Sequence, residues 1–261
     1  MTKKAHFLLI AVLIAGLMAP SMPVSAAYPP VKSILQKLDS LRKLDQDVSA
    51  KVSIVQTDKT QGTKQMNAVY FAKNLDDLFL IIMTGPETEK GNGYLKNGEN
   101  FWMYRRNTRT FQHIARNENI SGSDANAGDF ETPKYEVQYN AAKKKDGSEA
   151  ISDDTISGLA VYKVEIQSSL PEVDYPKKII WVRKDNLLPL KEQSFSLSGT
   201  LMNSQYFLKY SEINGKYIPV KQLVVDEFEK GNKTLWEISD ISFKKIADSV
   251  FTRSYLENLS K

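Results

Sequence analysis

A long succession of short apolar segments separated by turn residues dominates this chain of 261 residues. From residue 47 onward we expect strands at 48–57, 65–73, 78–84, 93–96, 101–105, 110–115, 159–168, 178–184, 189–197, 201–213, 217–227 and 234–243. Turn residues separate most of them, and Asn97-Gly98 between two apolar runs is a strong hairpin signal. This spacing predicts an antiparallel meander that curls toward a barrel.

Two amphipathic helices flank the predicted strands. The first covers residues 30–44, where an apolar stripe is formed by Val31, Ile34, Leu35, Leu38, Leu41 and Leu44. The second covers about 249–259 and carries Phe251, Tyr255 and Leu259 at intervals of four. Each helix has an apolar side that must pack against another element.

The N-terminal 26 residues have the pattern of a secretory signal peptide. Lys3 and Lys4 precede an apolar run at 7–18, and small residues follow at Val24-Ser25-Ala26. We expect cleavage after Ala26, with Ala27 as the alternative, and an uncleaved anchor as the competing interpretation. The mature chain, 27–261, is then expected to be a single exported domain, and it is not lipidated on cysteine because it has none.

Composition argues against several classes of function. The net charge is +4, and removal of Lys3 and Lys4 with the signal peptide leaves +2, so a polyanion such as nucleic acid is not an expected partner. Without cysteine, thiol catalysis and zinc–thiolate sites are excluded. His113 is the one imidazole of the mature chain, and we interpret it as a strand residue. We therefore expect no enzyme activity, no metal and no cofactor.

Two pairs of acids, Asp76-Asp77 and Asp153-Asp154, are the remaining catalytic candidates. Both pairs are predicted to lie at turns, where Asp bonds to its own backbone. An envelope hydrolase that uses them is the least favoured hypothesis. The polar stretch 117–158 is predicted to be a long excursion with a short helix or strand near 135–139, and its role is left open.

Several strands alternate, and others are apolar on both faces. Tyr162, Val164 and Ile166 face one way, and the segments 78–83 and 101–104 are apolar throughout. Two helices and a polar segment are expected to occupy only part of the volume on the concave side of a large curled sheet. Either an apolar cavity remains or the chain forms an ordinary packed sandwich, and the pattern leaves both open.

Basic and aromatic residues alternate in the stretch 101–116. A solvated strand face is the simpler interpretation. The functional one is a rim that attracts anionic lipid headgroups or an acidic partner, with Arg105, Arg106 and Arg109 as its candidates.

Four stretches in order resemble the LolA-like family of periplasmic outer-membrane lipoprotein-sorting carriers. They are NGENFWMYRRNTRTFQHI with the following Gly122-Ser123-Asp124, then YKVEIQSS with YPKKIIWVRKDNLLPLKEQSF, then YSEINGKYIPVKQLVVDE, and finally NKTLWEISDISFKKIADSVFTRSYLENL. Together they span 97–259. No arginine lies between Arg42 and Arg105, where the main lipoprotein carrier depends on one, so no ligand-contacting residue is transferred.

The resemblance implies a mainly β fold with flanking helices: an antiparallel, incompletely closed β-barrel of about 11 strands whose concave face is lidded by helices. It also implies a monomeric carrier that binds acyl chains of lipoproteins or other lipids and meets an inner-membrane transporter and an outer-membrane acceptor. Candidate cavity residues are Leu78, Leu80, Trp102, Tyr104, Tyr162, Val164, Ile166, Trp181, Met202, Tyr206, Leu208 and Tyr210. The alternative is an accessory protein of an inner-membrane transporter with a packed, ligand-free core.

Overall fold

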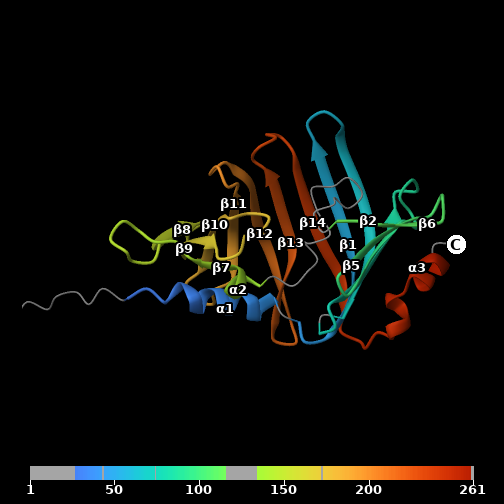
Figure 1. Ribbon diagram of the computed structural model, residues 1–261, viewed down its shortest axis with the longest axis horizontal. Helices are drawn as coiled ribbons and strands as arrows, with labels where there is room; N and C mark the ends of the chain where they lie inside the picture. The colour runs from blue at the N-terminus through green and yellow to red at the C-terminus, as the bar shows by residue number, and fades with distance from the viewer. Residues whose placement is uncertain (1–26, 43, 74, 116–133, 172, 260–261) are drawn as a thin grey trace, which may run out of the picture.

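The computed structural model describes residues 27–42, 44–73, 75–115, 134–171 and 173–259 (Figure 1). The predicted signal peptide and the Gly122-Ser123-Asp124 loop lie outside these residues. The helical elements are α1 (Val31–Arg42), α2 (Tyr135–Gln138), the 3₁₀ helix η3 (Asp248–Phe251) and α3 (Arg253–Leu259). The strands are β1 (Asp47–Asp58), β2 (Gly62–Lys73), β3 (Leu78–Gly85), β4 (Gly93–Asn97), β5 (Asn100–Arg105), β6 (Thr110–His113), β7 (Tyr139–Ala141), β8 (Ile151–Ile156), β9 (Leu159–Ser168), β10 (Lys177–Arg183), β11 (Pro189–Phe195), β12 (Leu201–Ile213), β13 (Lys216–Asp226) and β14 (Lys233–Ser242).

All fourteen strands belong to one antiparallel sheet. Its order is β6-β5-β4-β3-β2-β1-β14-β13-β12-β11-β10-β9-β7, and β8 pairs with β9. Neighbours in sequence are mostly neighbours in space, as short turns require, and the β1–β14 pairing joins the two halves of the chain. The mainly β, antiparallel prediction is confirmed, with fourteen strands in place of about eleven. No hydrogen bonds join β6 to β7, so the described sheet has two open ends.

The additional strands include β7 and β8, which lie in the stretch predicted to be a polar excursion. The placement of Asp153 and Asp154 at a turn was wrong, because both lie inside β8 and pair with Tyr162 and Val161 of β9. Strand propensity alone disfavours Asp, but β8 is an edge strand with its polar residues exposed. Asp76 and Asp77 do lie in the turn before β3.

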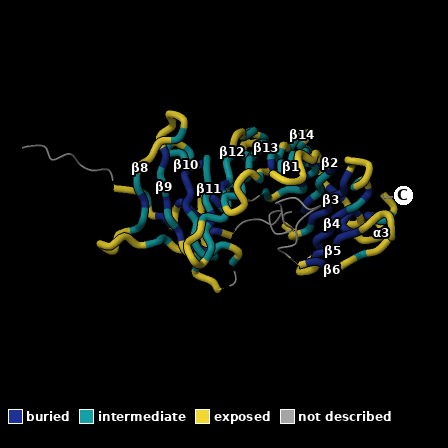
Figure 2. The backbone as a smooth tube through the Cα atoms, turned by 90° about the horizontal axis from the view of Figure 1, so that it is seen from above, coloured by how far each residue is buried: buried dark blue, intermediate teal, exposed yellow. Residues whose placement is uncertain are grey.

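The sheet is strongly curved, and its strands follow an arc when seen from above (Figure 2). Residues paired across strands share a face, so the register traces each face from strand to strand. One face, here the inner face, runs from Val164 of β9 through Ile180 and Glu192 to Gln205 of β12. It continues through Gln222, Trp236 and Ile54 to Met66 of β2. The opposite, outer face is the one on which α3 lies, on the outside of the arc (Figure 2).

The two flanking helices pack on opposite faces. Helix α1 buries Val31, Ile34, Leu35 and Leu38, as its stripe predicts, against inner-face residues of β9 and β10. The predicted C-terminal helix is divided into η3 and α3. The Thr252 hydroxyl between them accepts a hydrogen bond from the Tyr255 N–H at 3.2 Å, which caps α3. No helix among the described residues has the length and hydropathy needed to span a bilayer.

Candidate ligand-binding surface

Apolar side chains occupy both ends of the inner face. At the β1–β6 end they form one cluster, here the strand cluster, which consists of Val52, Ile54, Met66, Ala68, Ala72, Phe79, Ile81, Met83, Tyr94, Phe101, Met103 and Ile114. At the β9–β10 end Val164, Ile166, Ile180 and Val182 pack with α1, and this group is here the helix cluster. The register places both clusters on one face. All of these side chains are buried.

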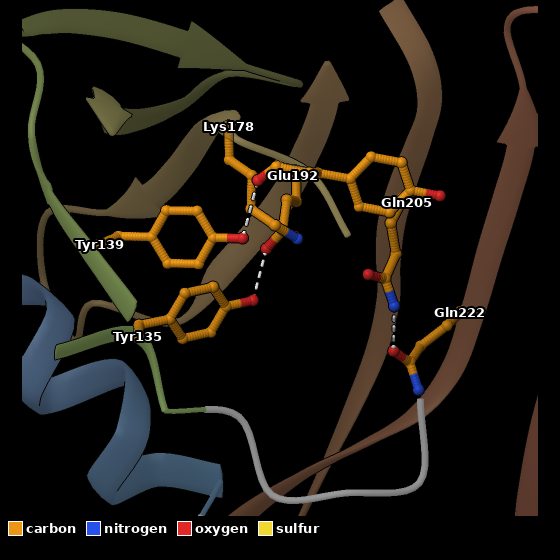
Figure 3. Close-up of polar contacts among 7 residues, drawn as sticks. Tyr135, Tyr139, Lys178, Glu192, Gln205 and Gln222 are labelled. Carbon is orange, nitrogen blue, oxygen red and sulfur yellow. Dashed lines mark hydrogen bonds and ion pairs between the residues drawn. The ribbon is translucent and has the colours of Figure 1, made fainter. Parts of the chain in front are cut away.

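Polar side chains lie between the two clusters, on strands β10 to β13 (Figure 3). They are Lys178, Glu192, Ser194, Gln205 and Gln222. Glu192 is only 4% exposed. Burying such groups costs free energy unless each finds a partner. These five side chains, here the polar band, lie between the two apolar clusters, beside the buried Phe207, which pairs with Gln222.

The charged part of this band is fully partnered. Lys178 forms an ion pair with Glu192, and the Tyr135 hydroxyl donates to Glu192 Oε2 at 2.6 Å (Figure 3). The Lys178 ammonium also lies 5.5–6.0 Å from the ring centres of Tyr135, Tyr139 and Tyr175. A cation held over aromatic faces gains electrostatic stabilisation. These contacts fix α2 and β7 over β10 and β11.

The amide part of the band lies on β12 and β13. Gln205 Nε2 donates to Gln222 Oε1 at 2.9 Å (Figure 3). Gln222 Nε2 in turn donates to the Pro219 carbonyl at 3.3 Å. With one lysine and one glutamate, this band is electrically neutral. Side chains of this kind form hydrogen bonds with amides, esters and hydroxyls, whereas a bare phosphate would need an unpaired cation.

The structure divides the twelve predicted cavity residues between the two faces. Tyr162, Val164 and Ile166 lie on the inner face in the helix cluster. Leu78, Leu80, Trp102 and Tyr104 lie on the outer face with η3 and α3. Trp181 and Tyr206 are also on the outer face, where the Lys191 ammonium lies 4.7 Å and 5.4 Å from their ring centres.

The other three predicted residues belong to β12. Leu208 is 52% exposed. The Tyr210 ring stacks on Phe207 with 6.2 Å between centres, and its hydroxyl donates to the Pro189 carbonyl at 2.7 Å. Met202 is half-buried at the start of the strand.

No residue of the strand cluster was among the predicted cavity residues. The alternation of Met66, Ala68, Tyr70 and Ala72 is the signal that could have found it. Strands such as β3 and β5 are apolar on both faces, so their sequences do not say which side is concave. The register to β1 and β14 decides that.

The predicted rim residues are exposed at one hairpin. Arg105 ends β5, and Arg106 and Arg109 lie in the turn to β6. The Arg106 N–H donates to Asn92 Oδ1 at 3.0 Å, which holds this hairpin beside the loop before β4.

The candidate catalytic residues Asp153, Asp154 and His113 each contact another side chain. Asp153 forms an ion pair with Lys184 at 2.7 Å, and Asp154 Oδ2 accepts from the Trp181 indole at 2.8 Å. This indole N–H holds the pKa of Asp154 below its ordinary value. His113 is exposed, with its ring edge-on to Trp102 at 5.2 Å. In the described part of the chain, no group of three or more His, Cys, Asp or Glu could hold a metal ion.

Comparison with known proteins identifies a matching family model and solved structures with a similar fold. A family model described as "uncharacterized protein" matches residues 75–258. The chain belongs to this family. None of the curated proteins matches the chain.

Solved structures show the same architecture. A LolA superfamily protein from Nitrosomonas europaea is 20% identical with a TM-score of 0.71, covering 87% of this chain and 100% of that chain. A domain from Vibrio parahaemolyticus, described as outer membrane lipoprotein-sorting, is 18% identical with a TM-score of 0.73, covering 87% and 97%. A DUF1329 family protein from Desulfovibrio piger is 19% identical with a TM-score of 0.73, covering 88% and 100%. The predicted resemblance to LolA-like proteins is confirmed in the fold.

Proposed function

We propose that this protein is a non-catalytic periplasmic carrier that binds acyl chains of lipoproteins or other lipids on the inner face and transfers them between the inner and outer membranes. The observation that carries the proposal is the presence of buried apolar clusters at both ends of one concave face. The LolA-like fold supports it. In this proposal an inner-membrane transporter supplies the cargo and an outer-membrane protein accepts it.

Burial of acyl chains provides the affinity. Each methylene removed from water contributes about 0.8 kcal/mol, so a chain of ordinary length needs only part of this face. The polar band, which includes Glu192 and Gln205, would hold the ester or amide linkage while the tails lie on the apolar clusters.

Because the apolar clusters are buried, binding requires an element to move. Helix α1 is the candidate, since one stripe of four apolar side chains holds it on the helix cluster. Its displacement would expose apolar surface that an acyl chain then covers. In this proposal either α1 or the acyl chain covers the helix cluster, and the two states are close in free energy. The acyl chain can therefore be released when α1 returns.

The three tryptophans provide a direct test. Trp236 lies on the inner face beside the strand cluster, and Trp102 and Trp181 lie on the outer face. Single-tryptophan variants, with Phe at the other two positions, are titrated with a fatty acid brominated near the middle of its chain. We expect saturable quenching of Trp236 and little quenching of Trp181. Quenching of Trp181 equal to that of Trp236, or none at Trp236, would contradict the proposal.

A second candidate is the accessory protein with a packed, ligand-free core. Burial of both apolar clusters favours it, together with the exposed Arg105–Arg109 hairpin. That hairpin would dock on anionic headgroups or an acidic partner. Replacing Arg105, Arg106 and Arg109 with Glu should then abolish sedimentation with phosphatidylglycerol vesicles, while Trp236 shows no quenching. Unchanged sedimentation would exclude the hairpin as the docking element.

A further inference from the structure

The outer face carries a pocket that the proposed carrier function does not use. It has a volume of about 410 Å³ and lies where the β4–β5 hairpin meets the start of α3. Pockets that hold small ligands have volumes of about 300–1,000 Å³. Its floor is apolar and consists of Leu95, Trp102 and Phe251.

The wall of the pocket is cationic. Arg253 begins α3, and its guanidinium carbon lies 4.8 Å from the Trp102 ring centre and 5.5 Å from that of Phe111. Contact with these two rings holds the guanidinium at the pocket, and Arg253 makes no side-chain hydrogen bond within the described residues. No carboxylate within the described residues forms an ion pair with Arg253, and no acid lines the pocket. Among the described residues that line the pocket, Arg253 therefore supplies the positive charge.

The remaining polar lining offers mainly hydrogen-bond donors. Asn97 already donates to the Phe251 carbonyl at 3.4 Å, and the Thr252 hydroxyl donates to the Ser249 carbonyl at 2.8 Å, so both support the wall. Asn100 and Ser254 are exposed at the mouth and make no side-chain hydrogen bond with the rest of the described chain. An amide NH₂ and a hydroxyl thus flank the guanidinium.

We propose that this pocket binds a carboxylate that has an apolar group beside it. The planar guanidinium can donate one hydrogen bond to each oxygen of a carboxylate. Asn100 or Ser254 can donate a further hydrogen bond to the same carboxylate oxygens. The apolar neighbour of the carboxylate packs on Leu95 and Trp102. Two sources share this chemistry: the C-terminal residue of a peptide and a free organic acid.

Binding is measured by NMR, from the indole N–H signal of Trp102 in a ¹H–¹⁵N spectrum of the whole protein. The signal is assigned by its absence from the spectrum of the W102F variant. The probes are Gly-Gly-Phe with a free carboxylate, the same peptide amidated, and 3-phenylpropanoate. We expect saturable shifts with the free peptide and binding at least tenfold weaker for the amidated one. Equal binding of 3-phenylpropanoate would identify a free acid as the source, and much weaker binding would identify a chain end. Equal binding of the amidated peptide, or no shift with either acid at millimolar concentration, would overturn the proposal.

Variants separate the charge from the fold. R253Q should weaken binding of the free peptide at least tenfold, and R253K should weaken it less because the charge remains without the planar stack. Lys230 is an exposed cation in the β13–β14 turn, and the control variant K230Q should bind as the wild type does. Thermal unfolding of R253Q checks that α3 stays docked. Wild-type affinity in a folded R253Q protein would contradict the assignment.

Discussion

The backbone N–H of Val31 donates a hydrogen bond to Glu149 Oε2 at 2.8 Å, across 118 positions of sequence. Val31 is the first residue of α1, whose N-terminal N–H groups have no partner within the helix. Glu149 lies just before β8. A carboxylate from the β7–β8 region therefore fixes the start of the helix that covers part of the inner face.

Replacing Glu149 with Ala should destabilise the protein by about 1 kcal/mol, because α1 loses the acceptor at its N-terminus. Urea unfolding measures the change. Glu87→Ala is the control, since Glu87 makes only a surface ion pair with Lys90. If α1 also controls access to the inner face, the Glu149 variant takes up the brominated fatty acid faster at Trp236. Equal stability of the two variants would show that the Glu149 contact contributes nothing.

Helix α3 approaches β4 at Gly93. A Cβ placed on Gly93 would lie 2.4 Å from Leu256 Cδ1 and 2.9 Å from the Ile81 carbonyl oxygen. Gly93→Ala should therefore cost about 1–3 kcal/mol through overpacking. Leu256→Ala alone should cost about 2–5 kcal/mol as a cavity. The double variant should cost less than the sum, because the clash with Leu256 is relieved. Strict additivity of the urea unfolding free energies would argue against this contact.

The ion pair in the polar band should be sensitive to the loss of one partner. Lys178→Met leaves the Glu192 carboxylate buried without its cation, and we expect a loss of about 3–5 kcal/mol. The double variant Lys178→Met with Glu192→Leu should recover part of this loss, because no charge remains to be desolvated.

Lys177 is the matched control for that series. It precedes Lys178 in β10 and pairs with Glu165 on the outer face, where its side chain is 45% exposed. Lys177→Met should change stability by about 1 kcal/mol or less. A similar cost for both lysines would refute the distinction between the buried and the exposed pair.

Acid should break the contact between Trp181 and Asp154. The indole hydrogen bond lowers the pKa of Asp154 below its ordinary value of 3.8. Because the folded pKa is the lower one, the stabilising contribution is present above the unfolded pKa and is lost as pH falls through the folded pKa. The NMR shift of the Trp181 indole N–H should therefore change as Asp154 is protonated, at a pH below 3.8.

Trp181→Phe should move the titration of Asp154 upward, since the largest cause of the lowered pKa is removed. Carboxyl ¹³C shifts follow the group directly. Trp236→Phe is the control, because Trp236 lies on the opposite face. An unchanged Asp154 titration in Trp181→Phe would mean that another group sets its pKa.

Local patterns in the sequence predicted most strands and both flanking helices. The stripe from Val31 to Leu38 identified α1, and Asn97-Gly98 identified the β4–β5 turn. β8 was missed because Asp153 and Asp154 favour turns, and their pairing with β9 is a contact that local sequence does not report. The predicted ligand cavity stays a prediction, and of its twelve candidate residues only Tyr162, Val164 and Ile166 lie with the helix cluster.

The sequence by itself determined the elements, because alternation and helical periodicity follow from backbone geometry within one segment. It also determined that no thiol chemistry is available. Only the tertiary structure decided which face of each strand is concave, since that depends on the register of β1 with β14 and on curvature accumulated over the whole sheet. It likewise placed Arg253 over Trp102, because residues so far apart in sequence meet only after the sheet has formed.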